Sequence, residues 1–180
     1  MQNTRFMKSK KPYTIRRQRG ASLLEGIAYL GIAAIVILGA VSLLMSAFSS
    51  AQTNRSSEEV ISIRTGVKKL YMGQSAAYGD GSLNEQLATA KVFPSTLAVS
   101  GANVTNTWNG AVAVTGAGAN FTISYAGVPQ DVCINLVSGN TGWVNVAVNG
   151  GDAIAQFPVT PTAATAACTT AANEIVWTAL

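Results

Sequence analysis

The feature that most constrains this chain is an apolar run at residues 26–48, which contains 23 residues and no charged side chain. A helix of that length can cross about 30 Å of hydrocarbon. One carboxylate, Glu25, stands at the start of the run and is the only charged residue between Ala21 and Gln52. Because a charge beside a membrane-length segment is costly, we treat Glu25 as a functional residue.

A basic, polar segment precedes the apolar run. Seven of the twelve Lys and Arg residues lie within residues 1–20, and the segment ends in Arg19-Gly20. Positive charge beside an apolar helix stays cytoplasmic, so the sequence predicts a cytoplasmic N-terminus with residues 50–180 across the membrane. From Ala21 onward five basic residues face eight acidic ones, a formal charge of −3. The high isoelectric point therefore comes from the tail, and we expect no nucleic-acid partner.

This order of parts resembles the N-terminal signature of the type IV pilins. In that family a basic leader ends in Gly, a prepilin peptidase cuts after it, and the fifth residue of the mature chain is Glu. The matching positions here are Gly20, Ala21 and Glu25, and the similarity extends over about residues 8–72. The long leader and the alanine after it are similar to the type IVb branch. Within that branch the chain most resembles the major pilins of conjugative and enterobacterial thin pili.

The resemblance implies an α+β fold, in which a long N-terminal helix packs against an antiparallel β-sheet head with one disulfide. It divides the chain into a leader at residues 1–20, which is removed, a helix at 21–73 and a globular head at 74–180. The helix would have an apolar transmembrane or filament-core half at 21–51 and an amphipathic half at 52–73. The head would begin with the αβ-loop at residues 74–107, the surface segment that links the helix to the sheet.

Two cysteines, Cys133 and Cys168, lie in the part that is predicted to reach the periplasm. That compartment is oxidising, so we expect the two thiols to be paired. The bridge would close a loop of about 36 residues, for which the chain-entropy relation gives roughly 3.8 kcal/mol. The resemblance implies that this pair bounds the D-region at residues 133–168, an exposed lobe that takes part in assembly.

For function, the resemblance implies a structural subunit, the major pilin of a type IVb pilus used in adhesion or conjugative mating contact. The expected partners are the prepilin peptidase, the pilus assembly machinery of the inner membrane, the membrane itself before assembly, and identical copies in a helical filament. The precursor would lie in the bacterial inner membrane with its head in the periplasm, and the assembled pilus would be extracellular.

Glu25 has a specific expected role in assembly. Cleavage after Gly20 creates an α-amino group on Ala21, which is positive at neutral pH. In a filament core, an unpaired ammonium and an unpaired carboxylate would each carry a large desolvation cost. Pairing Glu25 of one subunit with Ala21 of its neighbour removes both costs and sets the axial register between helices.

Other interpretations of the N-terminus stay open. A secretory signal cut near residues 49–51 would have an apolar core of only about 7–15 residues, and it would give Glu25 no role. A simple signal anchor fits the length but leaves Glu25 and the Arg19-Gly20-Ala21 junction unexplained. Glu25 could instead lie among lipid headgroups. A minor pilin, a secretion-system pseudopilin or a membrane-anchored periplasmic binding domain would share this N-terminus.

The composition argues against catalysis. The chain has no histidine, so it offers neither a Ser-His nor a Cys-His pair. Two cysteines without histidine do not complete a zinc site, and the carboxylates after Glu25 are scattered. We therefore expect no enzyme activity, no metal and no cofactor.

The helix is expected to continue past the apolar run to Gly73, because apolar residues recur there at helical spacing. These residues are Val60, Ile63, Val67, Leu70 and Tyr71. The stripe predicts one face packed on the head. The charged residues fall on the other faces, and Glu58 and Glu59 are expected to meet solvent or a neighbouring subunit.

The head alternates strand, turn and short helix patterns. The predicted helices are residues 84–89 and 129–139, the second of which carries Cys133. The predicted strands are residues 111–114, 121–125, 143–148, 153–157 and 174–178. Turns are expected at residues 78–81, 109–110 and 149–151, with a loop at 158–170. The resemblance implies that the C-terminal strand lies inside the sheet.

Overall fold

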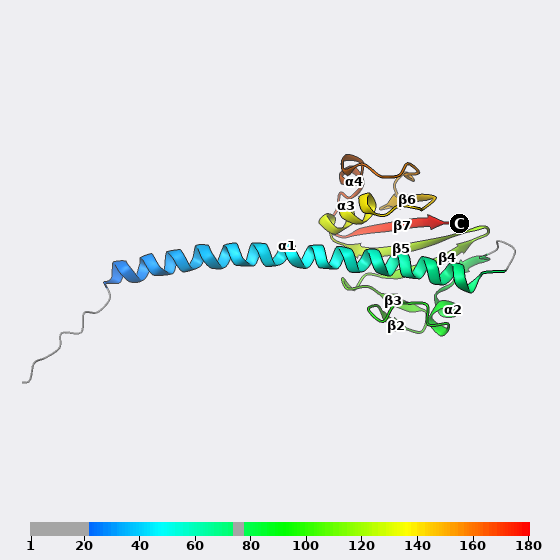
Figure 1. The fold of residues 1–180 in the computed structure, drawn as a ribbon, viewed down its shortest axis with the longest axis horizontal. Coiled ribbons are helices and arrows are strands. Elements are labelled where there is room, and N and C mark those ends of the chain that lie inside the picture. Colours follow the sequence, from blue (N-terminus) through cyan, green and yellow to red (C-terminus); the bar gives the residue numbers. More distant parts are fainter. Residues whose placement is uncertain (1–21, 74–77) are drawn as a thin grey trace, which may run out of the picture. The chain divides into compact units, whose positions relative to one another are not determined.

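The computed structural model describes residues 22–73 and 78–180 (Figure 1). The predicted leader, the Gly20-Ala21 junction and residues 74–77 of the predicted αβ-loop lie outside this range. The chain divides into two compact units, one ending at Leu43 and one spanning Leu44–Leu180.

Four helices occur in the described residues: α1 (Leu23–Leu70), α2 (Asn84–Thr89), α3 (Gln130–Gly139) and α4 (Pro161–Ala167). α1 is a continuous helix of 48 residues, with Glu25 in its first turn and two lysines in its last turn. Both placements are favoured by the helix dipole. The helix ends at Leu70, and a turn continues to Gly73, where the positive φ suits a residue without a side chain.

The strands in the described residues are β1 (Asp80–Ser82), β2 (Ala98–Ser100), β3 (Asn103–Thr105), β4 (Val112–Ala117), β5 (Asn120–Val128), β6 (Asn145–Val148) and β7 (Asn173–Ala179). Five of them form an antiparallel sheet in the order β1-β4-β5-β7-β6, while β2 and β3 pair separately. The C-terminal strand β7 therefore lies inside the sheet, as the resemblance implies. The α+β fold class is confirmed.

The core of the second unit lies between α1 and one face of the sheet (Figure 1). The helix contributes Val60, Ile63 and Val67, each fully buried. Alternate residues of β5 and β7 face them, because successive side chains of a strand point to opposite faces. The fully buried members of this set are Phe121, Ile123, Tyr125, Ile175 and Trp177. Burying side chains of this size contributes about 1.5–3 kcal/mol each, so this packing holds the second half of α1 on the head.

Three predictions for the head are wrong. The sequence predicts a turn at residues 78–81, but Asp80–Ser82 is strand β1, because β4 offers it an antiparallel partner. The strand predicted at 153–157 is reduced to a single bridge between Ile154 and Val146. The loop predicted at 158–170 contains α4, whose start is capped by the Thr160 side chain.

The stripe predicted on α1 holds only in part. Val60, Ile63 and Val67 are buried, but Leu70 is 42% exposed. Leu70 is the last residue of α1, whereas Tyr71, which follows it, is half-buried and packs against the core. The β2–β3 pair was not predicted from the sequence, because its strands have only three residues each.

Candidate functional site

Glu25 lies in the first turn of α1, at the start of its apolar half. The backbone N–H of Glu25 donates to the Ser22 carbonyl at 2.8 Å, so helix geometry positions the side chain. The Tyr29 hydroxyl, one turn later, donates to Glu25 Oε1 at 3.4 Å, and both side chains are exposed. Gly20 and Ala21, the other predicted residues of this site, lie outside the described range.

The apolar half of α1 exposes its large side chains. Leu23 is 83% exposed, Leu30 72% and Leu43 75%. Among the described residues, α1 is the one helix that is long and apolar enough to cross a membrane, and its most apolar part is not buried. A helix that is apolar all round is stable in lipid or against other helices, so this half requires a partner outside its own chain.

Glycines interrupt this half without breaking it. A Cβ added at Gly31 or Gly39 would meet no atom within 4 Å, so the chain itself does not require glycine at either position. Each glycine costs up to about 1 kcal/mol relative to alanine in a helix interior. Small residues on an apolar helix allow another helix to approach closely, which offsets this cost.

The second half of α1 buries a carboxylate that the sequence pattern assigns to solvent. Glu59 is only 3% exposed. Its Oε1 accepts a hydrogen bond from Arg55 Nε at 3.3 Å, and its Oε2 accepts one from the Tyr125 hydroxyl, also at 3.3 Å. Glu59 lies four residues before Ile63 and therefore shares the buried face. The prediction for Glu59 is wrong, while Glu58 is exposed as expected.

Tyr125 is buried beside the Glu59 carboxylate. Its side chain is fully buried on β5. Burial raises the pKa of the Tyr125 hydroxyl, and the charge of Glu59 and the hydrogen bond between them raise it further. Tyr125 therefore stays a hydrogen-bond donor over the ordinary pH range, which is what the buried carboxylate requires.

A chain of aromatic contacts runs from Tyr125 across the sheet and returns to α1. The Tyr125 and Trp177 rings meet edge to face with their centroids 6.0 Å apart. The centroids of the Trp177 and Trp143 rings are also 6.0 Å apart. The Arg64 guanidinium of α1 lies over the Trp143 ring, 4.7 Å from its centroid. Glu59 and Arg64 thus attach the second half of α1 to the head at both ends of this chain.

Two buried asparagines attach the αβ-loop to the sheet. Asn84 donates to two backbone carbonyls at 2.9 Å, and its Oδ1 accepts from the Val114 N–H on β4 at 2.8 Å. Asn106 donates to the Ala126 carbonyl on β5 at 2.8 Å and accepts from two backbone N–H groups of its own turn. Because these amides satisfy buried backbone groups, they fix the position of the loop.

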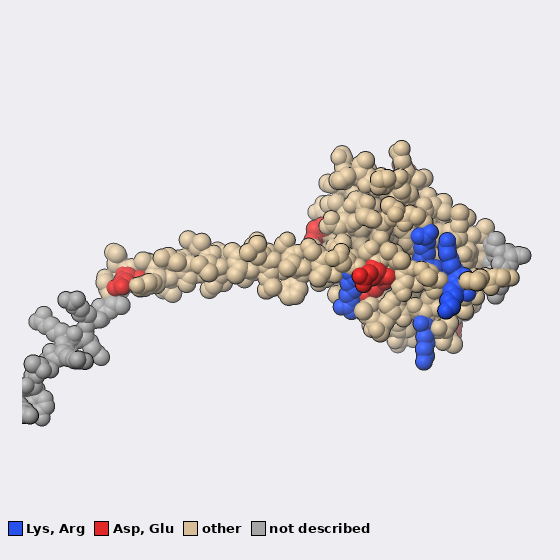
Figure 2. All heavy atoms as spheres, in the orientation of Figure 1, with Lys and Arg blue, Asp and Glu red and all other residues tan. Residues whose placement is uncertain are grey.

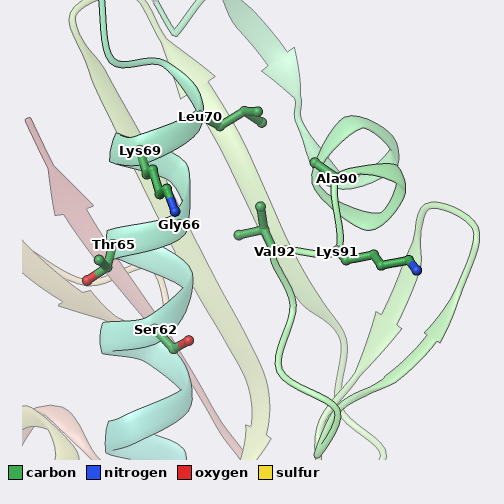
Figure 3. A pocket seen from close by; sticks show the side chains of 8 residues that line it. All are labelled: Ser62, Thr65, Gly66, Lys69, Leu70, Ala90, Lys91 and Val92. Carbon is green, nitrogen blue, oxygen red and sulfur yellow. The ribbon is translucent and has the colours of Figure 1, made fainter.

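A groove lies between α1 and the segment that follows α2 (Figure 3). It has a volume of about 660 Å³ and is lined by Ser62, Thr65, Gly66, Lys69, Leu70, Ala90, Lys91 and Val92. Val92 points toward α1, and a Cβ at Gly66 would lie 2.4 Å from Val92 Cγ1. Gly66 therefore lets the loop approach the helix. The charged residues of the lining are Lys69 and Lys91.

The predicted disulfide is present. Cys133 on α3 and Cys168 at the end of α4 are bonded, with their Cα atoms 6.0 Å apart, and both are fully buried. The Gln130 side chain donates to the Cys168 carbonyl at 2.9 Å. The bridge therefore ties together the two helices at the ends of the predicted D-region.

The second unit carries few charged side chains. Figure 2 shows Lys and Arg side chains gathered over the second half of α1 and the adjoining αβ-loop. These residues are Arg55, Arg64, Lys68, Lys69 and Lys91. Within the described ranges, no group of three or more His, Cys, Asp or Glu side chains is placed to hold a metal ion.

The sequence profile of the family described as "PilS N terminal" matches residues 50–180. The chain belongs to this family of type IVb pilins. The match covers the head and the second half of α1, and the Gly20-to-Glu25 signature lies outside it. The family match and the N-terminal motif therefore rest on different residues, and both indicate a type IV pilin.

The fold agrees as well. This pilin resembles the crystal structure of TcpA, a type IV pilin from the Vibrio cholerae El Tor biotype, with a TM-score of 0.53 and 13% sequence identity. The match covers 72% of this chain and 99% of the TcpA chain in that crystal structure. A search of curated protein sequences finds no match. Family and fold together identify a pilus subunit, which assembles with identical copies into a filament.

Sequence reasoning missed Glu59, Asn84 and Asn106, which position α1 and the αβ-loop. A signal for Glu59 was present, since it stands four residues before Ile63 and eight before Val67 on the buried face. The sequence gives no such signal for the two asparagines, because asparagine is a common residue of exposed turns and its burial is not visible in the pattern.

Proposed function

We propose that this pilin is the precursor of the major subunit of a type IVb pilus. A prepilin peptidase removes residues 1–20 by cutting between Gly20 and Ala21. Before assembly, the apolar half of α1 holds the subunit in the inner membrane, with the head in the periplasm. The assembly machinery of the inner membrane then adds the subunit to an extracellular filament that serves adhesion or conjugative mating contact.

The observation that carries this proposal is an exposed carboxylate at the start of an exposed apolar helix. Glu25 is exposed, and large apolar side chains such as Leu23 and Leu30 are exposed beside it. Lipid covers these side chains in the precursor, and copies of the same helix cover them in a filament. Lipid headgroups offer the carboxylate no fixed partner, whereas a neighbouring subunit offers the ammonium of Ala21 at a defined position.

The local geometry of Glu25 is compatible with that pairing. The Tyr29 hydroxyl bonds to one oxygen, Oε1, at a long 3.4 Å, and the side chain is exposed. An ammonium can therefore approach the carboxylate without displacing a strong contact. A charge-assisted hydrogen bond to an ammonium is shorter and about twice as strong as a neutral one, so it would dominate the environment of Glu25 in the filament.

The head suits a repeating, exposed position in a filament. It carries few charges, and the Cys133–Cys168 bridge stabilises its lobe. By position, the lobe at residues 133–168 and the αβ-loop are the parts of the head that we assign to contacts with neighbouring subunits or with a surface.

The test is the intact mass of protein sheared from cells that express the precursor together with its assembly machinery. The proposal predicts one abundant species that spans residues 21–180 and lacks the hydrogens lost in one disulfide. Gly20→Leu is the control variant, which should leave the full precursor in the membrane. A mature chain starting at Gln52 would show a secretory signal instead, and a full-length, membrane-bound wild type without filaments would show an anchored domain.

A further inference from the structure

Positive and negative side chains are separated along the second unit. After Lys91 the sequence contains no Lys or Arg, but it contains three acidic residues, Asp131, Asp152 and Glu174. The cations of the described residues all lie within residues 55–91. In the part of the chain that the structure describes, the one salt bridge joins Arg55 to Glu59, so the lysines and these three acidic residues have no ion-pair partner there.

Asp152 and Glu174 lie at one corner of the sheet, where β6 ends and β7 begins. The Asn149 N–H donates to the Glu174 carbonyl at 2.8 Å, and the Glu174 N–H donates to Asn149 Oδ1 at 2.9 Å. A turn closed by the bond from the Gly151 N–H to the Val148 carbonyl, at 2.9 Å, then leads to Asp152. Both carboxylates are exposed on backbone that hydrogen bonds hold in place. We call Asp152 and Glu174 the acidic corner.

The groove between α1 and the segment after α2 carries positive charge on both of its sides. Lys69 comes from α1 and Lys91 from the opposite side, where its side chain extends away from the helix (Figure 3). Both are exposed, and we call them the groove lysines. Ser62 and Thr65 add hydroxyl groups to the lining of this groove of about 660 Å³. Its polar lining therefore suits a negatively charged occupant.

Lys91 occupies a backbone position that favours glycine. Its φ is +54°, and it follows α2 directly after the final Ala90 cap. The Lys91 N–H donates to the Ala88 carbonyl at 3.1 Å, and the Val92 N–H donates to the Leu87 carbonyl at 2.9 Å. Helices that end with this pair of bonds usually carry glycine at the left-handed position. A lysine there is a cost to the backbone, which a contact of its charge outside the chain would offset.

We propose that the groove lysines of one subunit bind the acidic corner of a second copy of this chain in the filament. This contact rests on the proposed function, because it requires that identical subunits assemble. The two surfaces are different parts of the head, so the contact is heterologous. It leaves a free groove on one copy and a free acidic corner on the other, so that subunits can be added without closure.

Charge complementarity favours a second copy as the occupant. Each copy carries both the cations and the carboxylates, and neither set is neutralised by an ion pair among the described residues. A single exposed ion pair contributes little to stability, whereas like charges brought face to face are strongly disfavoured. The contact therefore acts mainly on register: it admits an arrangement in which corner meets groove and disfavours one in which groove meets groove.

Charge reversal in the full chain, expressed with its assembly machinery, tests this contact. The groove reversal is Lys69→Glu with Lys91→Glu, and the corner reversal is Asp152→Lys with Glu174→Lys. Each brings like charges together, so the yield of sheared filaments should fall at least about tenfold. Both reversals in one chain restore opposite charges and should recover most of the yield. Processed pilin in the membrane should stay at the wild-type level throughout, because all four side chains are exposed.

Net charge requires its own control, because the chain with both reversals also regains the wild-type net charge. Asp80→Lys with Glu85→Lys reverses two exposed carboxylates outside the acidic corner and changes net charge as the corner reversal does. Alone, this control should assemble normally. Combined with the groove reversal, it restores net charge without complementarity, and filament yield should stay low. Lys68→Glu, beside Lys69 but outside the groove lining, should also assemble normally.

The outcomes distinguish the contact from the filament itself. Wild-type yield from the groove and corner reversals would overturn the contact and leave the proposed function standing. Failure of the two reversals to rescue each other would show that groove and corner do not meet. Recovery by the mismatched combination would show that net charge governs assembly, which also overturns the contact. A processed wild type that forms no filament would overturn the proposed function and this contact with it.

A second variant decides the matter if a reversal lowers the amount of processed pilin. Lys69→Ala with Lys91→Gly removes both charges with residues that suit the helix and the left-handed position, so the head should fold normally. Filament yield should fall while processed pilin stays at the wild-type level. An unchanged filament yield from this variant would overturn the contact.

Discussion

The Tyr125 hydroxyl on β5 donates to Glu59 Oε2 on α1 at 3.3 Å, and both side chains are buried. This contact joins the helix to the middle of the sheet. The pKa of Tyr125 is raised by burial first and by Glu59 second, so the folded state disfavours ionisation of the phenol.

An alkaline loss of stability follows from that shift. The unfolded chain ionises Tyr125 near its ordinary pKa of about 10, whereas the folded chain does not. The contribution of Tyr125 to stability is therefore complete below about pH 10 and decreases above it by about 1.4 kcal/mol per pH unit. Urea unfolding of wild type and Tyr125→Phe between about pH 8 and about pH 11 measures this. The advantage of wild type should shrink as the pH rises, and parallel pH profiles would contradict the prediction.

The disulfide is expected to stabilise the head substantially. Cys133→Ser opens a loop of about 36 residues and should lower the free energy of unfolding by about 4 kcal/mol. Urea unfolding of the oxidised full chain measures the loss. The double variant with Cys133→Ala and Cys168→Ala is the control for effects of a single free thiol and should lose a similar amount. If reducing the wild type leaves its unfolding midpoint unchanged, the bridge does not stabilise the head.

Gly110 is required by close packing of the backbone. A Cβ at this position would lie 1.8 Å from the Ala126 carbonyl oxygen, a contact that no side-chain movement relieves. Gly110→Ala should therefore destabilise the head by about 1–3 kcal/mol. The matched variant is Gly139→Ala on α3, where a Cβ would meet nothing within 4 Å, so stability should be equal or slightly higher. Equal midpoints for both variants in urea unfolding would show that the β4–β5 region adjusts freely.

Substitution of Asn84 tests whether its buried side-chain amide fixes the position of the αβ-loop. Asn84→Ala leaves two backbone carbonyls and the Val114 N–H without their partner, which should cost about 2–4 kcal/mol. Asn135→Ala removes an exposed amide on α3 that bonds only within its own helix, and its effect should stay within about 0.5 kcal/mol. Thermal unfolding of both variants beside wild type checks this, and a tolerated Asn84→Ala would mean that water replaces the lost bonds.

Elements with strong periodic patterns could be predicted from the sequence. The alternation at residues 121–125 identifies the centre of β5, and the shared face of Val132, Cys133 and Leu136 identifies α3. The apolar stripe at Val60, Ile63 and Val67 identifies the packed half of α1. In each case one face is buried along its length, so the periodicity is visible without knowledge of the partner.

Elements that depend on a partner distant in the sequence could not be predicted from the sequence. β1 is three exposed residues, with a positive φ at Gly79 just before it and at Gly81 inside it, and only pairing with β4 makes it a strand. α4 has the composition of a loop, although the Thr160-Pro161 pair is a capped helix start that the sequence does contain. Glu59 looked like a surface residue because its two partners, Arg55 and Tyr125, are recognisable only once the helix lies on the sheet.

Only one half of the candidate site, Glu25, could be predicted from the sequence and then located in the structure. Glu25 is identified by its position alone, as the one charge beside a long apolar run. Its proposed partner, the amine of Ala21, exists only after cleavage and belongs to another subunit, so no contact within one chain can reveal it. The pairing stays a prediction that assembly experiments must test.

The most direct measurement compares processed pilin in the membrane with pilin in sheared filaments for Glu25→Leu. The variant makes the segment more apolar and leaves the basic leader unchanged, so insertion and cleavage after Gly20 should persist. Filament yield should fall about a hundredfold or more, because removing one partner of a buried ion pair costs about 3–5 kcal/mol. Tyr29→Phe keeps the carboxylate, removes only the hydroxyl and should assemble normally. Wild-type filament yield from Glu25→Leu would contradict the account and leave Glu25 as a lipid-facing charge.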